Sequence, residues 1–536
     1  MMREEAEQGV SVARRSFVGL AAGAGAAAAS GLAASAGAAA AAGPTGVKHA
    51  APPRAGFQPD DIVMLDAVSL SSAIHTRRVS CVEVMTAYLD HIERINPKVN
   101  AIVALQERGG LLEQAGQRDA QLARGESMGA LHGFPHAVKD LQAVKGIRTT
   151  QGSPIFKDEI PNTEGLMVER LRNAGAIFIG KTNTPEFGLG SHTYNPVYGP
   201  THNAYDQSRS AGGSSGGAGV GLALRMLPVA DGSDFGGSLR NPAGWNNVFG
   251  FRTSYGCVPS EGHDVWLPSL SVLGPMARTV SDLALLLSVQ AGYDARMPLA
   301  MEGEGRRFQT RLDRDMKGKR IAWAGDFKGF TPNEPGVLDA CRKALRNFAS
   351  MGCVVEDAIP DHPLEPVWDA LKRIRGWQSG GGLLPYYNDA QKRALLKPEA
   401  IYEIELGLKQ SAQDIIAAFV VRTGWYQTVR KFFERYDYLV MPTSQLFPFP
   451  IEEHWPRQIA GVPMTTYHEW MKATFLITMS GCPSLAVPAG FTAGGLPIGL
   501  QIVAPHRHEL DCLHLAYAYE AAAHEVVGRL PPLLRG

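Results

Sequence analysis

The chain has 536 residues, of which 45% are hydrophobic and 19% charged, a composition typical of globular proteins and sufficient for a large core. The 52 Lys and Arg residues balance the 52 Asp and Glu residues, so no net charge favours nucleic acid or an acidic membrane as a partner. Six cysteines lie far apart without a CxxC motif, compatible either with buried thiols or with one or two disulfides: Cys81, Cys257, Cys341, Cys353, Cys482 and Cys512.

Residues 1–43 have the character of an export signal. The run Arg14-Arg15-Ser16-Phe17-Val18 is followed by an uncharged tract rich in alanine and glycine that extends to Gly43. These features predict a twin-arginine (Tat) signal cleaved between Ala40 and Gly43, and therefore a periplasmic or secreted protein that meets the Tat export machinery. The alternative is an alanine-rich tail, with which the protein would stay in the cytoplasm. We expect a polar linker at 44–64 and one large domain at 65–536.

From residue 65 on, hydrophobic periodicity predicts helices that alternate with short strands. Ser80 and Glu83 have the spacing of a capping box, and the helix that follows is expected to bury one face: Met85, Tyr88, Leu89, Ile92 and Ile95. Further helices are predicted at 112–122, 163–174, 335–351 and within 365–435. Apolar strands are predicted at 102–105, 134–138, 176–180, 319–323, 354–355, 438–443 and 482–488. This alternation is typical of an α/β fold with a parallel or mixed sheet.

The stretch from Arg209 to Trp245 holds two clusters of glycine and serine, at 212–217 and 236–238. Glycine allows a ligand to approach the main chain closely, so backbone N–H groups there can face a reacting oxygen. A phosphate-binding loop is excluded because no Gly-Lys-Ser/Thr follows. A flexible linker is disfavoured because Val220, Leu222 and Leu224 interrupt the glycines with apolar side chains.

These two clusters, together with Val138-Lys139-Asp140 upstream, resemble the motifs of the amidase-signature hydrolases. Ser214 follows Lys139 by 75 residues and Ser238 follows Ser214 by 24, which is the spacing of that family. The similarity extends from about Leu70 to Glu520. It implies a single catalytic domain on a mixed central β-sheet flanked by helices, with a variable region at 365–480 that shapes the substrate pocket.

The resemblance also implies a Ser–cis-Ser–Lys triad of Lys139, Ser214 and Ser238, with a cis peptide between Gly213 and Ser214. Ser238 would be the nucleophile and would form an acyl-enzyme. Ser214 would relay its proton to a neutral Lys139, whose pKa burial would lower from about 10.4 to about 7–8. The oxyanion hole would consist of backbone N–H groups: those of Phe235, Gly236, Gly237 and Ser238.

Asp234 and Arg240 flank the second cluster. We expect them to hold its loop, and an ordinary surface ion pair is the alternative. Two positions depart from the family pattern: Ser233 replaces the usual threonine, and Arg252 lies in a segment that usually reads Leu-Lys-Pro-Thr.

The predicted activity is hydrolysis of the C–N bond of small or aryl/acyl amides, with an amide substrate and water as reactants. Ester or carbamate cleavage by the same serine is a close alternative. Two further possibilities are a glutamine amidotransferase A-type subunit or a non-catalytic binding protein on the same scaffold. No cofactor or nucleic acid is expected. No metal site is expected either, because no HExxH motif is present and the only local histidine cluster, His506 and His508 beside Glu509, is expected to be a solvated loop. The sequence leaves a homodimer open.

Overall fold

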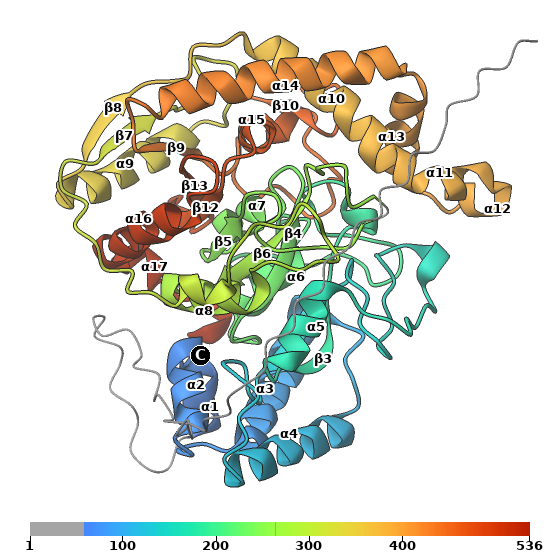
Figure 1. Cartoon of the computed structure of the whole chain (residues 1–536), viewed down its shortest axis with the longest axis vertical. Helices are drawn as coiled ribbons and strands as arrows, with labels where there is room; N and C mark the ends of the chain where they lie inside the picture. The colour runs from blue at the N-terminus through green and yellow to red at the C-terminus, as the bar shows by residue number, and fades with distance from the viewer. Residues whose placement is uncertain (1–57, 263, 536) are drawn as a thin grey trace, which may run out of the picture. The chain divides into compact units, whose positions relative to one another are not determined.

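A computed structural model describes residues 58–262 and 264–535 (Figure 1). Its main sheet has eight strands in the order β4-β6-β5-β12-β13-β9-β7-β8. Neighbours from β4 to β9 are antiparallel, whereas β7 pairs in parallel with both β9 and β8. This confirms the predicted α/β fold with a mixed sheet. The bounds are β4 (Ala230–Asp234), β5 (Phe249–Arg252), β6 (Val272–Ala277), β7 (Arg320–Trp323), β8 (Val354–Asp357), β9 (Tyr438–Pro442), β12 (Ser484–Phe491) and β13 (Pro497–Val503).

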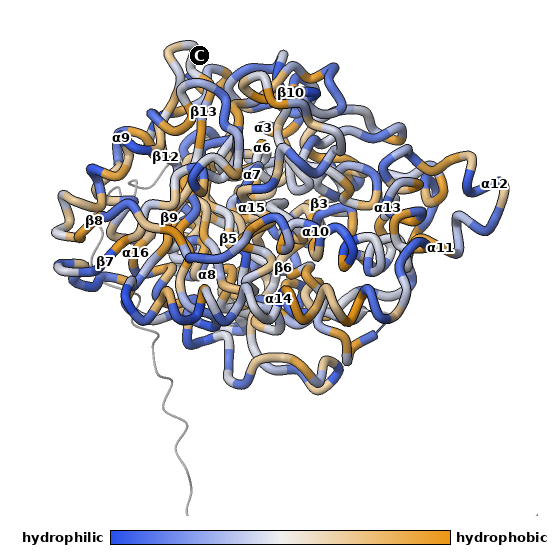
Figure 2. Tube along the Cα trace, turned by 90° about the horizontal axis from the view of Figure 1, so that it is seen from above, coloured by the Kyte–Doolittle hydropathy of each residue, from blue (hydrophilic) through white to orange (hydrophobic). Residues whose placement is uncertain are grey.

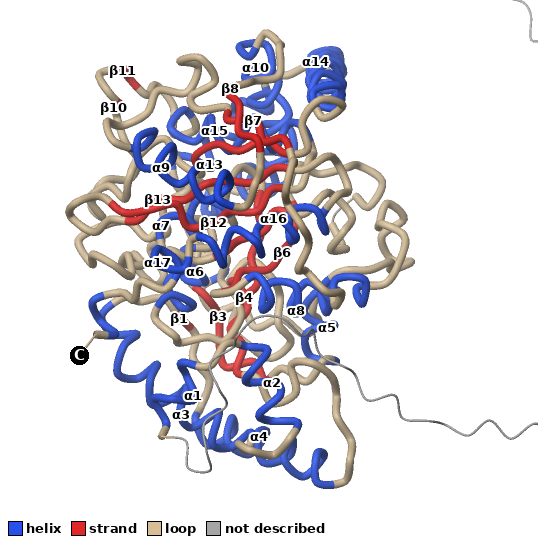
Figure 3. Tube along the Cα trace, turned by 90° about the vertical axis from the view of Figure 1, so that its left-hand side faces the viewer, coloured by secondary structure: helices blue, strands red, loops and turns tan. Residues whose placement is uncertain are grey.

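A second sheet has the order β1-β3-β2, with β1 (Ile102–Val103) antiparallel and β2 (Pro135–Lys139) parallel to β3 (Ile177–Thr182). Figure 3 shows the strands following one another from β8 and β7 down to β4 and β3. The edge strand β2 meets the edge strand β4 at the side chain of Asp231. Asp231 Oδ2 accepts a hydrogen bond from the backbone N–H of Lys139 at 3.2 Å, and its Oδ1 lies 3.0 Å from His136 Nε2. We call this junction the β2–β4 seam. A short hairpin of β10 (Gln458–Ile459) and β11 (Val462–Pro463) lies apart from both sheets.

The first helices are α1 (Pro59–Met64), α2 (Ala67–His75), α3 (Cys81–Ile95) and α4 (Arg108–Ala123), and α3 packs against both α1 and α4. The predicted capping box is present, since Ser80 Oγ accepts from the N–H of Glu83 and Glu83 accepts from that of Ser80. The five apolar residues predicted for one face of α3 are all buried. The predicted linker boundary at 64 is wrong: residues 59–64 form α1, because Ile62 and Val63 are apolar and pack into the core.

The next helices are α5 (Leu166–Asn173), α6 (Gly216–Ala223), α7 (Arg240–Trp245) and α8 (Val280–Gln290). Every residue of α6 is buried. A Cβ on Gly217 would lie 2.4 Å from the backbone nitrogen of Asn183 and 2.5 Å from the carbonyl oxygen of Ala101. Glycine at this position therefore lets α6 contact the backbone beside β1 and β3, which fixes the loop that precedes the helix.

The second half of the chain covers the main sheet with helices. In α9 (Val337–Ser350), hydrophilic and hydrophobic residues alternate along the trace in Figure 2, and the apolar ones, such as Val337 and Phe348, are buried. The region 365–435 is largely helical, as predicted: α10 (Leu364–Arg375), a π-helical turn (Gly376–Gly380), α11 (Gly381–Asn388), α12 (Ala390–Arg393), α13 (Pro398–Leu408) and α14 (Ala412–Phe432). Helix α15 (Lys472–Ser480) follows after β9 and the β10–β11 hairpin. The last helices are α16 (Glu509–Ala522) and α17 (His524–Val527).

All six cysteines are free and buried, so the disulfide alternative does not apply. Within the described residues, no helix is long and apolar enough to cross a membrane. The same residues contain no group of three or more His, Cys, Asp or Glu side chains placed to hold a metal ion. Glu509 differs from the predicted solvated loop, because it begins α16 in a buried position and accepts a hydrogen bond from the N–H of Ser254 at 2.9 Å.

Candidate active site

Lys139 is the last residue of β2, and its side chain ends in a cluster of serine hydroxyl groups. Its Nζ lies 2.7 Å from Ser214 Oγ, 2.9 Å from Ser215 Oγ and 3.0 Å from Ser233 Oγ. The lysine is fully buried. Burial lowers the pKa of Lys139 to about 7, even though the carboxylates of Asp231 and Asp234 act to raise it. A large fraction of this lysine is therefore neutral near neutral pH and able to accept a proton.

Ser214 lies in the loop that leads into α6, immediately after a cis peptide bond between Gly213 and Ser214. The expectation of a cis peptide at this position is thereby confirmed. The N–H of Gly213 donates to Asn241 Oδ1 at 3.2 Å, so α7 holds the turn in place. Ser214 is buried, and its hydroxyl group contacts Lys139 Nζ at 2.7 Å.

Ser238 follows β4 and precedes α7, and the backbone joins it to the first cluster. The N–H of Ser215 donates to the carbonyl oxygen of Ser238 at 3.2 Å. Ser214, Ser233 and Ser238 all line one cavity of about 310 Å³. The structure therefore brings the three residues of the expected triad to one place, with Ser238 facing the cavity and Lys139 behind Ser214.

The backbone N–H groups of the second cluster do not all have the same role. The N–H of Gly237 donates to Asp234 Oδ1 at 2.8 Å. Within the described residues, the N–H groups of Phe235, Gly236 and Ser238 have no acceptor. Three of the four expected oxyanion donors thus have no acceptor among the described residues, whereas the N–H of Gly237 holds the loop to Asp234.

Gly236 is held from the other side by α15. Thr474 Oγ1 donates to the carbonyl oxygen of Gly236 at 2.6 Å, and a Cβ on Gly236 would lie 2.0 Å from the ring of Phe475. Only glycine fits this contact without displacing the ring. The packing of α15 therefore determines the direction of the neighbouring N–H groups.

Asp234 is the charged centre of the loop. It pairs with Arg240 at 3.0 Å and with Arg252 at 3.2 Å, and both arginines are buried. Burial alone would raise the pKa of the Asp234 carboxyl, but the two guanidinium groups hold it well below its usual range. The surface ion pair that the sequence left open is thus wrong for Asp234 and Arg240, because neither side chain reaches solvent.

Two residues of the site have roles that the sequence did not predict. Arg252, which in the sequence is only a departure from the family pattern, contacts Asp234 and donates to the carbonyl oxygen of Leu270 at 2.9 Å. Asp231, at the β2–β4 seam, supports the backbone of Lys139 and supplies a negative charge near its ammonium group. A second aspartate three residues before Asp234, directly after the apolar run Leu227-Pro228-Val229-Ala230, is the signal that could have indicated it.

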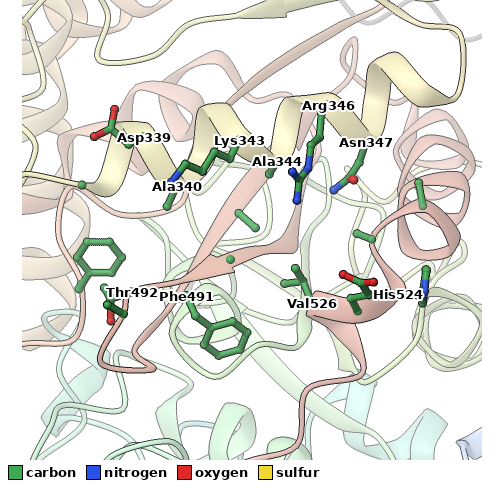
Figure 4. Close-up of a pocket in the computed structure, with 18 of the residues that line it drawn as sticks. Asp339, Ala340, Lys343, Ala344, Arg346, Asn347, Phe491, Thr492, His524 and Val526 are labelled. Atoms are coloured by element: carbon green, nitrogen blue, oxygen red, sulfur yellow. The ribbon is translucent and has the colours of Figure 1, made fainter.

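The cavity has an apolar wall and a polar wall. Leu141, Phe187, Leu189 and Leu383 contribute apolar surface, whereas the polar lining comes from Gln151, Ser269, Ser271, Arg375, Gln378 and Ser379. A larger cavity, of about 660 Å³, lies between α9 and the segment after β12, and Figure 4 shows Lys343, Arg346 and His524 around it. It contains none of the expected triad residues, so we assign the chemistry to the smaller cavity.

The fold is that of a hydrolytic enzyme, and a cluster of lysine and serine side chains lies at its candidate site. The sequence model of the Amidase family matches residues 83–513. The chain belongs to the amidase signature family, and it is an amidase, an enzyme that hydrolyses the C–N bond of amides.

Relatives of known name support this assignment. The chain is 35% identical over 460 residues to an acylamidase of Rhodococcus erythropolis, covering 85% of this chain and 95% of the relative. It is 32% identical to the A-type subunit of the glutamyl-tRNA(Gln) amidotransferase of Alkaliphilus metalliredigens, covering 82% and 92%. Among solved structures, a bacterial aryl acylamidase of the amidase signature family matches with a TM-score of 0.80 and 29% identity, covering 86% of this chain and 97% of that one.

Proposed function

We propose that the protein hydrolyses small acyl or aryl amides with Ser238 as nucleophile, Ser214 as proton relay and Lys139 as base. The observation that carries this proposal is the 2.7 Å contact between Lys139 Nζ and Ser214 Oγ at the wall of the cavity that Ser238 lines. A buried lysine with a pKa near 7 is suited to a general base at neutral pH. No cofactor enters this chemistry.

In the acylation half-reaction, Ser238 Oγ attacks the amide carbonyl carbon while its proton passes to Ser214 and from Ser214 to Lys139. The tetrahedral intermediate places a negative charge on the former carbonyl oxygen. The same relay then returns a proton to the departing nitrogen, and the C–N bond breaks to leave an acyl-enzyme. In the second half-reaction, water attacks the carbonyl carbon of the acyl-enzyme ester and gives its proton to the same relay. The ester bond then breaks, which releases the acid and restores the hydroxyl group of Ser238.

The oxyanion is stabilised by the backbone N–H groups of Phe235, Gly236 and Ser238. Each such donor contributes about 2.7–4 kcal/mol to transition-state stabilisation in related chemistry. Gly237, Asp234 and Arg240 support the loop rather than the oxygen, because the N–H of Gly237 is bonded to Asp234.

The proposed substrates are small or aryl/acyl amides because the cavity of about 310 Å³ has an apolar wall and lies next to the nucleophile. The acylamidase relative and the aryl acylamidase structure agree with this class. Ester and carbamate carbonyls would react with the same serine. The amidotransferase relatives make an A-type amidotransferase subunit the second candidate function. An amidase releases the free acid from a small amide without partner subunits, so an assay of the purified chain alone distinguishes the amidase from the amidotransferase subunit.

The N-terminal proposals concern residues outside the described part of the chain. We propose that residues 1–43 are a Tat export signal and that the mature protein is periplasmic or secreted. The arginine pair at 14–15 and the uncharged tract that follows it support this proposal.

The experiment that tests the proposed function uses Ser238→Ala. The wild type should be labelled by a fluorophosphonate probe and should hydrolyse a panel of aliphatic and aryl amides. Ser238→Ala should lose both labelling and turnover while keeping the wild-type circular dichroism spectrum. Labelling that persists in the folded variant would contradict the assignment of Ser238.

A further inference from the structure

Arg375 is a buried cation in the polar wall of the cavity. It is the last residue of α10 and lines the same cavity as Ser214 and Ser238, and only 5% of its side chain is exposed. A charged side chain this deeply buried is costly to desolvate, so its partners and its unused hydrogen-bonding capacity indicate what it does.

Three side chains from other elements fix the guanidinium group. Its Nε donates to Glu403 Oε1 at 2.6 Å and to His468 Nε2 at 3.1 Å, and its Nη2 donates to Tyr467 Oη at 3.1 Å. Tyr467 in turn donates to Glu403, whose carboxylate is fully buried. This network comes from α10, α13 and the segment before α15, so the position of the cation is determined on several sides.

Aromatic rings close the remaining faces. The guanidinium carbon lies 4.6 Å from the ring centroid of Phe235 and 5.5 Å from that of Phe475. Phe235 carries one of the proposed oxyanion N–H groups, and Phe475 contacts Gly236. Arg375 therefore lies directly beside the place where a substrate carbonyl would be held.

One nitrogen of the group remains unused. Within the described residues, nothing accepts a hydrogen bond from Nη1, while Nε and Nη2 are both engaged. The charge, by contrast, is balanced. Burial would raise the pKa of Glu403, but the Arg375 guanidinium lowers it to about 2, and burial lowers the pKa of His468, so the ionised pair of Arg375 and Glu403 is neutral overall. Among the described residues that line the cavity, Arg375 is also the one charged side chain.

We propose that Arg375 is a specificity-determining residue that selects substrates carrying a second, uncharged oxygen acceptor, to which Nη1 donates. This inference rests on the proposed function of the same cavity. An acceptor without a charge fits best, because Glu403 already neutralises the cation and a carboxylate would be desolvated without a free counter-charge. A substrate that lacks the acceptor would leave the charged donor unpaired in the closed site.

The test compares matched amides in two series. For the acyl side, the compounds are the anilides of 4-oxopentanoic acid, of 4-methylpentanoic acid and of succinic acid (as the monoanilide). For the amine side, they are acetanilides with a para acetyl, isopropyl or carboxylate group. In each series the ketone and the branched alkane have nearly the same shape, and only the ketone offers a neutral acceptor.

In at least one series, the kcat/KM ratio of the ketone to its isopropyl-type analogue should be about tenfold or more higher in the wild type than in a variant without the Arg375 donor, and the carboxylate should not exceed the ketone in the wild type. The series that shows the gain identifies the side of the substrate that Arg375 contacts. No gain in either series, or a faster carboxylate, would overturn the proposal.

The variant R375M/E403Q removes the donor and its counter-charge together, so no buried charge is left unpaired. In this variant the ketone-to-isopropyl ratio should fall by about tenfold or more in the series that shows the gain, because comparing the same ratio in two enzyme variants cancels differences in leaving-group chemistry. Persistence of the advantage would overturn the proposal. The matched control is R373M/D414N, which removes an exposed ion pair two residues earlier on α10 and should leave the ratio unchanged.

Fluorophosphonate labelling of Ser238 shows whether each variant keeps an intact site. If R375M/E403Q does not label, Arg375→Lys serves in its place, since it keeps a cation beside Glu403 and lacks the Nη1 donor. Failure of the proposed function is distinguishable: Ser238→Ala would then retain hydrolysis of all six compounds. If only the role proposed for Arg375 is wrong, hydrolysis will still require Ser238, and the ketone-to-isopropyl ratio of R375M/E403Q will equal that of the wild type.

Discussion

Lys139 Nζ lies 2.7 Å from Ser214 Oγ, and both side chains are buried. A lysine at the end of a strand is more often a surface residue, whereas the side chain of Lys139 is fully buried. Lys139→Arg should reduce acylation by about three orders of magnitude or more, because a guanidinium stays protonated and cannot act as a base. Single-turnover acylation measures this directly, and a near-wild-type rate would show that Lys139 is not the base.

The charge of Asp231 should set the pH at which the enzyme becomes active. Only neutral Lys139 accepts a proton, so kcat/KM should rise with pH through the lysine's pKa of about 7. The Asp231 carboxylate favours the ammonium form and raises that pKa. Asp231→Asn should therefore move the acid limb of the pH–rate profile to lower pH, and a shift to higher pH would contradict this account.

Gly236→Ala should damage the oxyanion loop. Its Cβ would lie 2.0 Å from the ring of Phe475, so either the ring or the loop must move. We expect a loss of about 1–3 kcal/mol in the free energy of unfolding and a fall in kcat of about a hundredfold. The control is Gly381→Ala in α11, where a Cβ has nothing within 4 Å and should stabilise the helix by about 0.5–1 kcal/mol. Equal effects of the two substitutions in urea unfolding and steady-state kinetics would exclude the steric argument.

Arg252→Met should be strongly destabilising. It removes one of the two cations that pair with buried Asp234 and leaves the carbonyl oxygen of Leu270 without its donor. We expect a loss of about 3–5 kcal/mol in urea unfolding. Arg342→Met, which breaks the exposed pair with Asp357, should cost no more than about 1 kcal/mol. A similar loss of unfolding free energy in Arg252→Met and Arg342→Met would show that burial does not increase the contribution of the Arg252–Asp234 pair to stability.

Replacement of Arg14 and Arg15 by Lys should retain the protein in the cytoplasm, because the Tat receptor reads the arginine pair. Cell fractionation and the mass of the mature N-terminus measure this. An uncleaved wild-type protein in the cytosol would contradict the export proposal.

The sequence predicted those parts of the molecule that depend on local patterns. The capping box at Ser80 and the strand that leads to Lys139 appear where local patterns placed them, and the cis peptide before Ser214 appears where the family resemblance placed it. The boundary predicted between linker and domain was wrong because α1 has only six residues, too few to show a hydrophobic periodicity. Its burial depends on contacts with α3, which follows it in the chain.

The remaining site residues depend on contacts between distant segments. Asp231 meets His136 across 95 positions, and Arg375 meets Tyr467 across 92. No periodicity within either segment indicates such a partner. A contact between near neighbours in the chain can be equally hard to predict. Only the folded loop shows that the N–H of Gly237 donates to Asp234.

The six buried thiol groups can serve as probes of local unfolding. They are spread from Cys81 to Cys512, and burial raises the pKa of each thiol, so both access and thiolate formation are suppressed in the folded chain. Incorporation of a thiol reagent in native buffer should therefore follow the rate at which each neighbourhood transiently opens. Mass spectrometry of the labelled peptides would rank these regions by local stability without any substitution.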